Sequence, residues 1–182
     1  MAYEKFGQKI AELQLDWTLF KVEFIDRDGF NRFANEFYSN IYQYSEIWIT
    51  GYFSETLRND LEKIIRVDKR KIRLICPEFP LKSPRDKKNL EALKKLAKAG
   101  AEIKVNNRLH ARFLVAHCPE APQVMGLLII GSFDFNTECI GRERYDAGIK
   151  TKNPDLVESA RKLFEQIWKE PESLQLKEAF KL

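Results

Sequence analysis

Short apolar runs that alternate with helical stripes, and then follow one another directly, constrain the fold of this chain most. Strand-forming runs separated by helical patterns predict strands at 19–25, 46–53, 72–76 and 101–105. Consecutive strands are predicted from there on, at 108–117, 124–131 and 144–151. This order predicts an α/β fold: a mixed, mostly parallel central sheet with helices on both faces. Such sheets bind ligands beyond the strand ends, where the loops converge.

Capping residues mark the predicted helices. Ser83-Pro84 begins one helix and Gly100 ends it, and Asn153-Pro154 begins the last clear helix. Four other helices are predicted: at 3–14, at 30–42, after Ser54 and at 172–181. The second of these is indicated by aromatic residues that recur at helical spacing from 30 to 42. Aromatic residues at that spacing are typical of a buried face.

The composition suits one folded domain. The 182 residues are 44% hydrophobic and 12% aromatic, enough for a sizeable core. We predict a single domain over 1–182, with 1–44 as an N-terminal helix and strand extension. The longest apolar run, Leu127–Ile130, is far below the roughly 20 residues of a membrane helix. The three scattered cysteines form neither a CxxC pair nor an even disulfide set, so we expect a cytoplasmic protein with no membrane association.

Positive charge is concentrated in the middle of the chain. Residues 66–112 hold fifteen Lys and Arg against five Asp and Glu, although the whole chain carries only +4. A basic segment between acidic ends indicates a surface for a polyanion, with nucleic acid (DNA or RNA) as the expected partner. Its predicted contacts are Lys69, Arg70, Lys71, Lys87 and Lys88. The alternative for residues 85–98 is a lysine-rich, solvated helix face.

Both histidines fall within ten residues of each other, His110 and His117. On a regular strand His110 and Arg112 share a face, whereas His117 points the opposite way. This geometry excludes a simple two-histidine site within one chain and counts against a zinc site. We expect no metal and no cofactor. His110 is the residue that we expect to act; the alternative is a partly buried strand histidine with a satisfied ring.

The turn at Gly131-Ser132 completes a candidate phosphate site. It ends an apolar strand, where backbone amides and a hydroxyl can point at an anion. A histidine, the Arg112 guanidinium, this hydroxyl and a polar side chain at 134 or 136 suit a phosphate group. Ser132 as a triad nucleophile is disfavoured because the GxSxG elbow is absent.

These spacings resemble the phospholipase D superfamily, whose motif HxKxxxxD is followed by GSxN. His110 takes the histidine position, Arg112 the lysine, His117 the aspartate, Gly131-Ser132 the GS and Asp134 the asparagine. The resemblance continues through an acidic residue, Asp146, before a small apolar strand. It covers roughly 45–170, with 104–168 the specific part, and is strongest to the small nucleases that carry one motif.

The resemblance implies a metal-independent phosphodiesterase or nuclease with a histidine nucleophile. A second histidine, from a second motif, protonates the leaving oxygen; a chain with one motif implies a homodimer with a shared site. Arg112 and Ser132 would hold phosphate oxygens, and Asp134 would orient His110 or pair with Arg112. Gly131, Asn136 and Asp146 are further expected substrate-binding residues.

Two departures from the motif support an alternative. Arginine replaces lysine at 112, and Asp134 replaces asparagine, where a carboxylate would repel a phosphodiester. Asn136 could supply the missing amide if the loop shifts by two residues. The alternative is a catalytically impaired module that binds nucleic acid or serves as a dimeric scaffold. A subunit whose activity needs another chain is a third reading.

Overall fold

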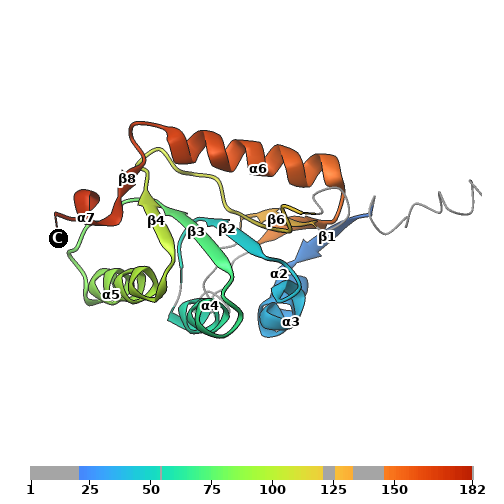
Figure 1. Cartoon of the computed structure of the whole chain (residues 1–182), viewed down its shortest axis with the longest axis horizontal. Helices are drawn as coiled ribbons and strands as arrows, with labels where there is room; N and C mark the ends of the chain where they lie inside the picture. Colours follow the sequence, from blue (N-terminus) through green and yellow to red (C-terminus); the bar gives the residue numbers. More distant parts are fainter. Residues whose placement is uncertain (1–20, 54, 121–125, 133–145, 182) are drawn as a thin grey trace, which may run out of the picture.

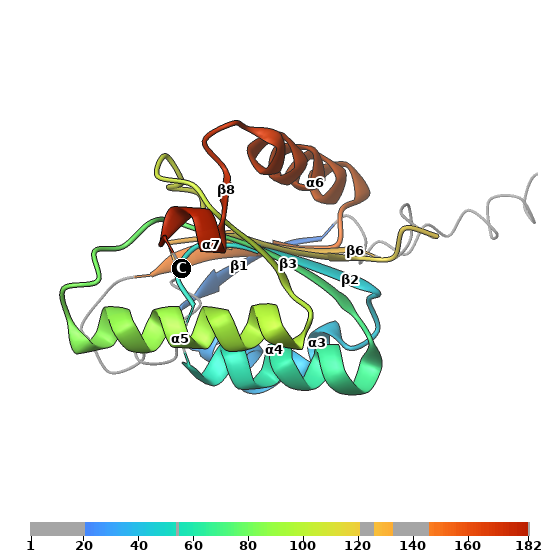
Figure 2. The same cartoon turned by 60° about the vertical axis from the view of Figure 1, so that its left-hand side comes forward.

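An eight-stranded sheet organises the chain. The computed structural model describes residues 21–53, 55–120, 126–132 and 146–181. The strand order is β1-β7-β6-β5-β2-β3-β4-β8. Helices α2 to α5 lie on one face of the sheet and α6 lies across the other (Figures 1 and 2). The predicted helix at 3–14 lies outside the described residues.

The strands and helices have the following bounds. The strands are Val22–Asp26 (β1), Glu46–Thr50 (β2), Lys71–Cys76 (β3), Glu102–Val105 (β4), Phe113–His117 (β5), Gly126–Gly131 (β6), Ala147–Thr151 (β7) and Leu174–Gln175 (β8). The helices are Arg27–Asn35 (α2), Phe37–Ile41 (α3), Glu55–Asp68 (α4), Pro84–Ala99 (α5), Pro154–Lys169 (α6) and Leu176–Ala179 (α7). The aromatic stripe from 30 to 42 is thus divided between two helices, α2 and α3.

The alternating part of the chain forms the parallel centre of the sheet. β2, β3 and β4 are parallel neighbours, joined by α4 and α5. Parallel strands need a crossover that returns the chain to the edge of the sheet where it started, and a helix usually provides it. The predicted strand–helix alternation before residue 105 is therefore confirmed.

The mixed sheet with helices on both faces is confirmed, but the expectation that it is mostly parallel is wrong. Of the seven strand pairs in the described residues, only the two inside β2–β4 are parallel. β5 and β6 are close in sequence, and a short connection forces an antiparallel pair. β1 and β8 then join antiparallel at the two edges.

The caps of α5 and α6 agree with the sequence. The Ser83 hydroxyl accepts from the backbone N–H of Asp86 at 3.1 Å, and the Asp86 carboxylate accepts from the Ser83 N–H at 3.1 Å. α5 ends at Gly100, whose φ of 121° is open to glycine but strained for other residues. Asn153 caps α6 through the N–H groups of Asp155 and Leu156.

The sheet separates two apolar clusters. Ile47, Ile49, Leu74 and Leu114 belong to the cluster on the side of α2 to α5. The cluster under α6 consists of Trp48, Ile75, Leu109, Phe113, Val115, Leu128, Val157 and Phe164. Because β5 contributes to both clusters, all five of its residues are buried. None of the helices in the described residues is long and apolar enough to cross a membrane, and the cytoplasmic location stays a prediction.

Gly126 lets α6 approach the sheet closely, so Gly126→Ala should destabilise the fold. A Cβ at Gly126 would lie 2.7 Å from Cγ1 of Val157, a side chain that is only 2% exposed. We expect a loss of about 1–3 kcal/mol in the free energy of unfolding, measured in urea. Adding Val157→Ala should recover part of that loss, because it removes the clashing methyl groups. Strictly additive losses in the double variant would contradict this account.

Candidate active site

The predicted motif residues gather along one edge of the sheet, the edge formed by the ends of its central strands and not by the outermost strands β1 and β8. β5 runs antiparallel to β2, with Thr50 opposite Phe113, so the chain just before β5 lies where β2 ends. β6 ends and β7 begins at the same edge, since Gly131 lies opposite Gly148. The structure therefore brings together at this edge His110, Arg112, Gly131, Ser132 and Asp146. Asp134 and Asn136 lie outside the described residues.

The segment that carries His110 is a loop, and the prediction of a strand from 108 is wrong. β5 begins only at Phe113, so strand alternation does not set the directions of His110 and Arg112. The cause is a turn at Asn106, whose side-chain oxygen accepts from the N–H of Arg108 at 2.8 Å. The Asn106 carbonyl also accepts from the N–H of Leu109 at 3.1 Å. Leu109 is then buried in the cluster under α6.

Asn106 is a structural residue of the site that the sequence did not single out. Its side chain is 1% exposed, and its amide nitrogen donates to the Ser173 hydroxyl at 2.8 Å and to Glu170 at 3.1 Å. These contacts fasten the loop before β5 to the segment that follows α6. An asparagine directly after a predicted strand was the available signal, but the pair Asn106-Asn107 does not reveal which one is buried.

A chain of hydrogen bonds links Arg112, Ser132 and Asp146. Nη1 of Arg112 donates to the backbone carbonyl of Ser132 at 2.8 Å. The Ser132 hydroxyl donates to a carboxylate oxygen of Asp146 at 2.8 Å and accepts from the N–H of Ala147 at 3.2 Å. Two backbone hydrogen bonds extend the strand pairing here. The N–H of Gly131 donates to the carbonyl of Arg112 at 3.2 Å, and the N–H of Ser132 donates to the carbonyl of Ala147 at 3.0 Å. Arg112, Ser132 and Asp146 therefore form one hydrogen-bonded set, which Arg112 joins through the Ser132 backbone and Asp146 through the Ser132 side chain.

His110 stands beside this set with an exposed side chain. The alternative of a partly buried strand histidine is wrong, because His110 lies neither in a strand nor in the core. An exposed imidazole at this edge of the sheet can reach a ligand in solvent. A histidine, a guanidinium and a hydroxyl held at one edge suit the binding of a phosphate group.

Comparison with known proteins identifies the family. The family model described as "Cardiolipin synthase, PLD-like domain" matches residues 40–168, which is most of the chain. This chain belongs to the PLD-like family. The resemblance to the phospholipase D superfamily is thereby confirmed, whereas a search of curated proteins finds no match.

Solved structures show the same fold at low sequence identity. Polyphosphate kinase from Porphyromonas gingivalis is 22% identical, with a TM-score of 0.64 over 84% of this chain and 26% of that one. Nuc from Salmonella typhimurium, a phospholipase D family member, is 13% identical, with a TM-score of 0.61 over 85% and 95%. NucT from Helicobacter pylori is 12% identical, with a TM-score of 0.64 over 85% and 98%. The PLD-like chain spans about a quarter of the kinase and nearly all of Nuc and NucT.

His117, at the aspartate position of the PLD motif, lies at the opposite end of β5 and is 1% exposed. Its ring meets Trp48 edge-on at 4.6 Å. Burial, together with the nearby cations Arg161, Arg73 and Lys71, lowers the pKa of His117 to about 3. Nε2 lies 3.5 Å from a carboxylate oxygen of Glu46, but this contact does not outweigh burial and three cations. His117 is therefore a neutral core residue at pH 7, separate from His110.

The lysine and arginine residues predicted to contact nucleic acid lie at opposite ends of the strands. β3 begins at Lys71 and runs about 17 Å toward the edge that carries His110. Lys69, Arg70 and Lys71 therefore lie at the far edge, and Lys71 pairs with Glu46 at 3.7 Å. Lys87 and Lys88 lie in the first turns of α5, which follows the end of β3 and so begins near the candidate site. In the described residues, no three His, Cys, Asp or Glu side chains converge as metal ligands would.

Asn106→Ala should destabilise the chain and loosen the His110 loop. It removes the partner of the buried Ser173 hydroxyl, of the half-buried Glu170 carboxylate and of the Arg108 N–H, which we expect to cost about 1–3 kcal/mol in the free energy of unfolding. Asn107→Ala is the matched control, because Asn107 is exposed, and should change stability by less than about 0.5 kcal/mol. Equal effects of the two substitutions in urea unfolding would refute the role of Asn106.

The lowered pKa of His117 predicts a loss of stability in acid. The unfolded chain takes up a proton at about pH 6.5 and the folded chain only near pH 3, so stability falls as pH drops below 6.5. Between pH 7 and pH 5 we expect the native chain to lose about 2 kcal/mol more than His117→Gln does. Urea unfolding at both pH values measures this difference. Equal losses between pH 7 and pH 5 in the native chain and in His117→Gln would contradict the lowered pKa of His117.

Proposed function

We propose that this PLD-like chain is a metal-independent phosphodiesterase that cleaves nucleic acid, with a site shared by two copies of the chain. The observation that carries the proposal is the hydrogen-bonded set of Arg112, Ser132 and Asp146 beside the exposed His110. A nucleophile, a fixed cation and oriented hydroxyl and amide groups are what phosphoryl transfer requires of a protein.

In the first step, a ring nitrogen of His110 attacks the phosphorus atom of a phosphodiester. The bond from phosphorus to the leaving oxygen breaks, and a phosphohistidine forms. His110 of the partner subunit donates a proton to the leaving oxygen, which departs as an alcohol. In the second step, the same partner histidine takes a proton from water. The water oxygen attacks phosphorus, the phosphorus–nitrogen bond breaks, and His110 is regenerated.

The neighbouring side chains have distinct proposed roles. Arg112 neutralises the charge on the non-bridging phosphate oxygens, and Asp134 orients His110 or pairs with Arg112. The Ser132 hydroxyl donates to Asp146, so it can donate to a phosphate only after it turns from that carboxylate. Gly131 contributes close backbone approach, and Asn136 is the proposed source of an amide contact.

An uncovered apolar row beside the site supports the homodimer. Phe24, Ile149 and Ile130 lie opposite one another on adjacent strands, on the face that α6 covers only in part. Phe24 is 71% and Ile130 38% exposed, and Val22 is exposed on the same face. A single residue pair, Gly131 and Gly148, separates the row from Ser132 and Ala147, which lie at the edge of the sheet that carries His110. A second copy seated on this row would bury apolar surface and bring two His110 residues toward one site.

Cations near this edge support a nucleic-acid substrate. Lys82, Lys87 and Lys88 are exposed in the loop before α5 and in its first turns. Lysines at this distance from the chemistry would contact phosphates on either side of the scissile bond and make binding sensitive to salt. Lys69, Arg70 and Lys71 would contact only a long substrate that crosses the sheet to its far edge.

A second function is favoured by the same hydrogen bonds. Arg112 is bound to the Ser132 carbonyl, and the Ser132 hydroxyl is bound to Asp146, so these polar groups satisfy one another without a ligand. A site closed in this way suits a catalytically impaired module that binds nucleic acid or serves as a dimeric scaffold. Whether the chain cleaves a phosphodiester at a measurable rate decides between the phosphodiesterase and the impaired module.

The deciding experiment is cleavage in EDTA. Purified protein is incubated with labelled single- and double-stranded DNA and RNA, beside His110→Ala and the exposed neighbour Asn107→Ala as matched control. We expect cleavage that resists EDTA, is retained in Asn107→Ala, and falls on the order of 10³-fold or more in His110→Ala.

Two other outcomes would overturn the enzyme proposal. Salt-sensitive binding without cleavage would support the impaired module instead. Equal cleavage by the native chain and by His110→Ala would exclude His110 as the nucleophile. Analytical ultracentrifugation tests the shared site, and a strict monomer that still cleaves would exclude it.

A further inference from the structure

Tyr52 is an exposed aromatic residue just beyond the end of β2. It is 39% exposed, although the backbone on either side of it is held in place. The N–H of Gly51 donates to the carbonyl of Ile75 in β3 at 3.0 Å. The next residue, Phe53, is buried in the cluster on the side of α2 to α5. Tyr52 therefore combines a fixed backbone with an exposed side chain.

Tyr52 lies beside the loop that carries His110. In the antiparallel pair of β2 and β5, Thr50 is opposite Phe113, and the chain continues past the same edge of the sheet after Thr50 and before Phe113. At about 3.3 Å per residue, Tyr52 lies at most about 7 Å and His110 at most about 10 Å beyond this last pair. The loop from β4 to β5 also crosses the ends of β3 and β2, because those two strands lie between β4 and β5 in the sheet.

Tyr52 and Asn89 line the same small hollow at the ends of β2 and β3. Phe53, Cys76 and Phe79 form its base and are buried, so they offer no surface to a ligand. The rim is different, because Tyr52 is exposed and Asn89, in the first half of α5, is half-buried. We call these two rim residues the Tyr52 platform.

The polar and aromatic groups of the Tyr52 platform are not engaged by the described part of the chain. Within those residues, no stacked ring, cation or hydrogen-bonding group pairs with the side chain of Tyr52, and none pairs with the amide of Asn89. An aromatic ring can stack on any nucleobase, because every base has a π face. A side-chain amide both donates to and accepts from the edge of a base. Together the two groups suit a nucleobase.

Exposed lysines near the Tyr52 platform suit the backbone of the same ligand. Lys88 directly precedes Asn89 in α5, and Lys82 lies in the loop before that helix. Cations placed there can bind phosphates on either side of a base that stacks on Tyr52. In a duplex, both faces of a base are covered by its neighbours, so this stacking requires an unpaired base.

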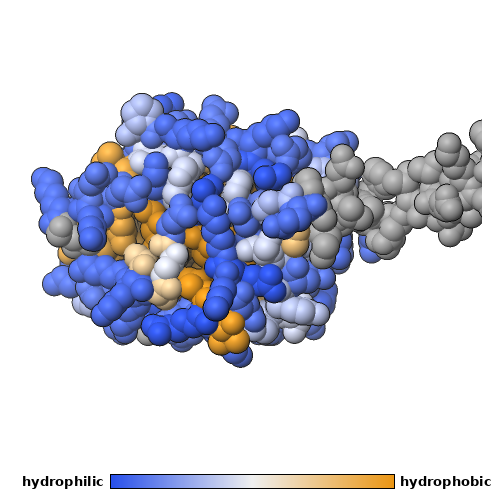
Figure 3. All heavy atoms as spheres, viewed as in Figure 1, coloured by the Kyte–Doolittle hydropathy of each residue, from blue (hydrophilic) through white to orange (hydrophobic). Residues whose placement is uncertain are grey.

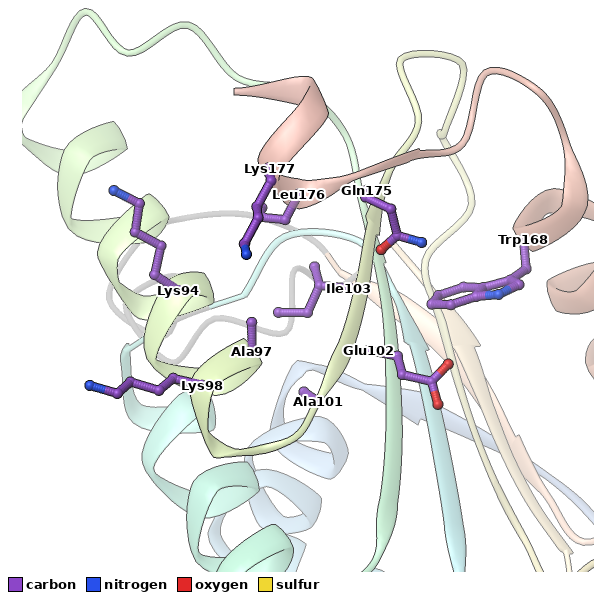
Figure 4. A pocket seen from close by; sticks show the side chains of 10 residues that line it. All are labelled: Lys94, Ala97, Lys98, Ala101, Glu102, Ile103, Trp168, Gln175, Leu176 and Lys177. Carbon is purple, nitrogen blue, oxygen red and sulfur yellow. The ribbon is translucent and has the colours of Figure 1, made fainter. Parts of the chain in front are cut away.

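The larger pocket between α5, β4 and α7, about 950 Å³, suits a nucleobase less well (Figure 4). Its apolar residues Ile103 and Leu176 are only 3% and 6% exposed. In the space-filling view, hydrophilic side chains break up the hydrophobic areas between α5 and α6 (Figure 3). Trp168, the aromatic residue that lines this pocket, already stacks on Phe164 with ring centroids 5.7 Å apart. The ring of Tyr52 is therefore the better stacking surface.

We propose that the Tyr52 platform binds an unpaired nucleobase beside the scissile phosphate, so that the site takes single-stranded nucleic acid. The base would stack on the ring of Tyr52, and its edge would form hydrogen bonds with the amide of Asn89. Lys82 and Lys88 would contact the neighbouring phosphates. The inference rests on the proposed function for the reaction at His110, but binding of the base requires no cleavage.

Fluorescence anisotropy with the full chain tests the Tyr52 platform, in the His110→Ala background so that the probe stays intact. The probes are labelled single strands of DNA and RNA and an abasic strand with the same number of phosphates. Tyr52→Ala should weaken binding of both strands that carry bases about tenfold, because stacking does not read the sugar. Asn89→Ala should weaken it about fivefold. Neither substitution should change binding of the abasic strand more than about twofold.

Two control variants separate the ring of Tyr52 from general effects of substitution. Tyr52→Phe keeps the aromatic ring and should bind within about twofold of the unsubstituted residue. Tyr42→Ala removes a tyrosine that is 52% exposed but precedes β2, at the opposite ends of the strands, and should also stay within about twofold. Equal weakening of the abasic strand by Tyr52→Ala would overturn the inference, and so would a duplex that depends on Tyr52 as strongly as a single strand does.

Cleavage by the native chain distinguishes this inference from the proposed function. Cleavage that needs His110, together with binding that is unaffected by Tyr52→Ala, would overturn the Tyr52 platform alone. Base-dependent binding through Tyr52 in a native chain that cleaves nothing would overturn the phosphodiesterase and support the platform.

Discussion

The insertion of β5 between β2 and β6 is the constraint on which the rest of the structure depends. β5 joins the parallel half of the sheet to its antiparallel half and is buried on both faces. Its entry point is fixed by a buried hydrogen bond from the N–H of Phe113 to the hydroxyl of Thr50, 3.0 Å long. Because β5 enters there, the loop before it must lie at the carboxyl end of β2, and that position brings His110 to the site.

The same strand explains why the two histidines differ so strongly. His110 precedes β5 and is exposed, whereas His117 ends β5 beneath α6. There His117 packs on Trp48, whose ring also contacts the guanidinium groups of Arg73 and Arg161 at 5.3 and 5.5 Å. Arg73 in turn pairs with Glu165 of α6 at 2.6 Å. A neutral histidine among cations fits the core there, and the aspartate position of the motif has become part of the packing of α6 on the sheet.

Among the described strands, β1 and β6 carry apolar side chains that are exposed beside the candidate site. Phe24 is 71% and Ile130 38% exposed, and Ile149 of β7 lies between them. This row lies on the antiparallel side of β5, whereas β2, β3 and β4 lie on the other side. The surface proposed for self-association is therefore separate from the parallel centre of the sheet.

Much of the fold could be predicted from local patterns. Ser83, Gly100 and Asn153 mark helix ends because capping depends only on near neighbours in the chain. The strands of the first half were recognisable for the same reason. The direction of most strand pairs was not, because pairing joins residues far apart in sequence, as in the contact of β1 with β7.

The sequence by itself determined the family, the alternation of the first half and the choice of His110, Arg112 and Ser132 as candidates, since these rest on residue types and short spacings. Only the tertiary structure decided that His110 lies in a loop, that Asn106 holds this loop, and that Lys69–Lys71 lie at the far edge. The physical reason is that burial and hydrogen-bond partners come from distant segments. Ser173 and Glu170 are contacts of Asn106 only once α6 has packed across the sheet.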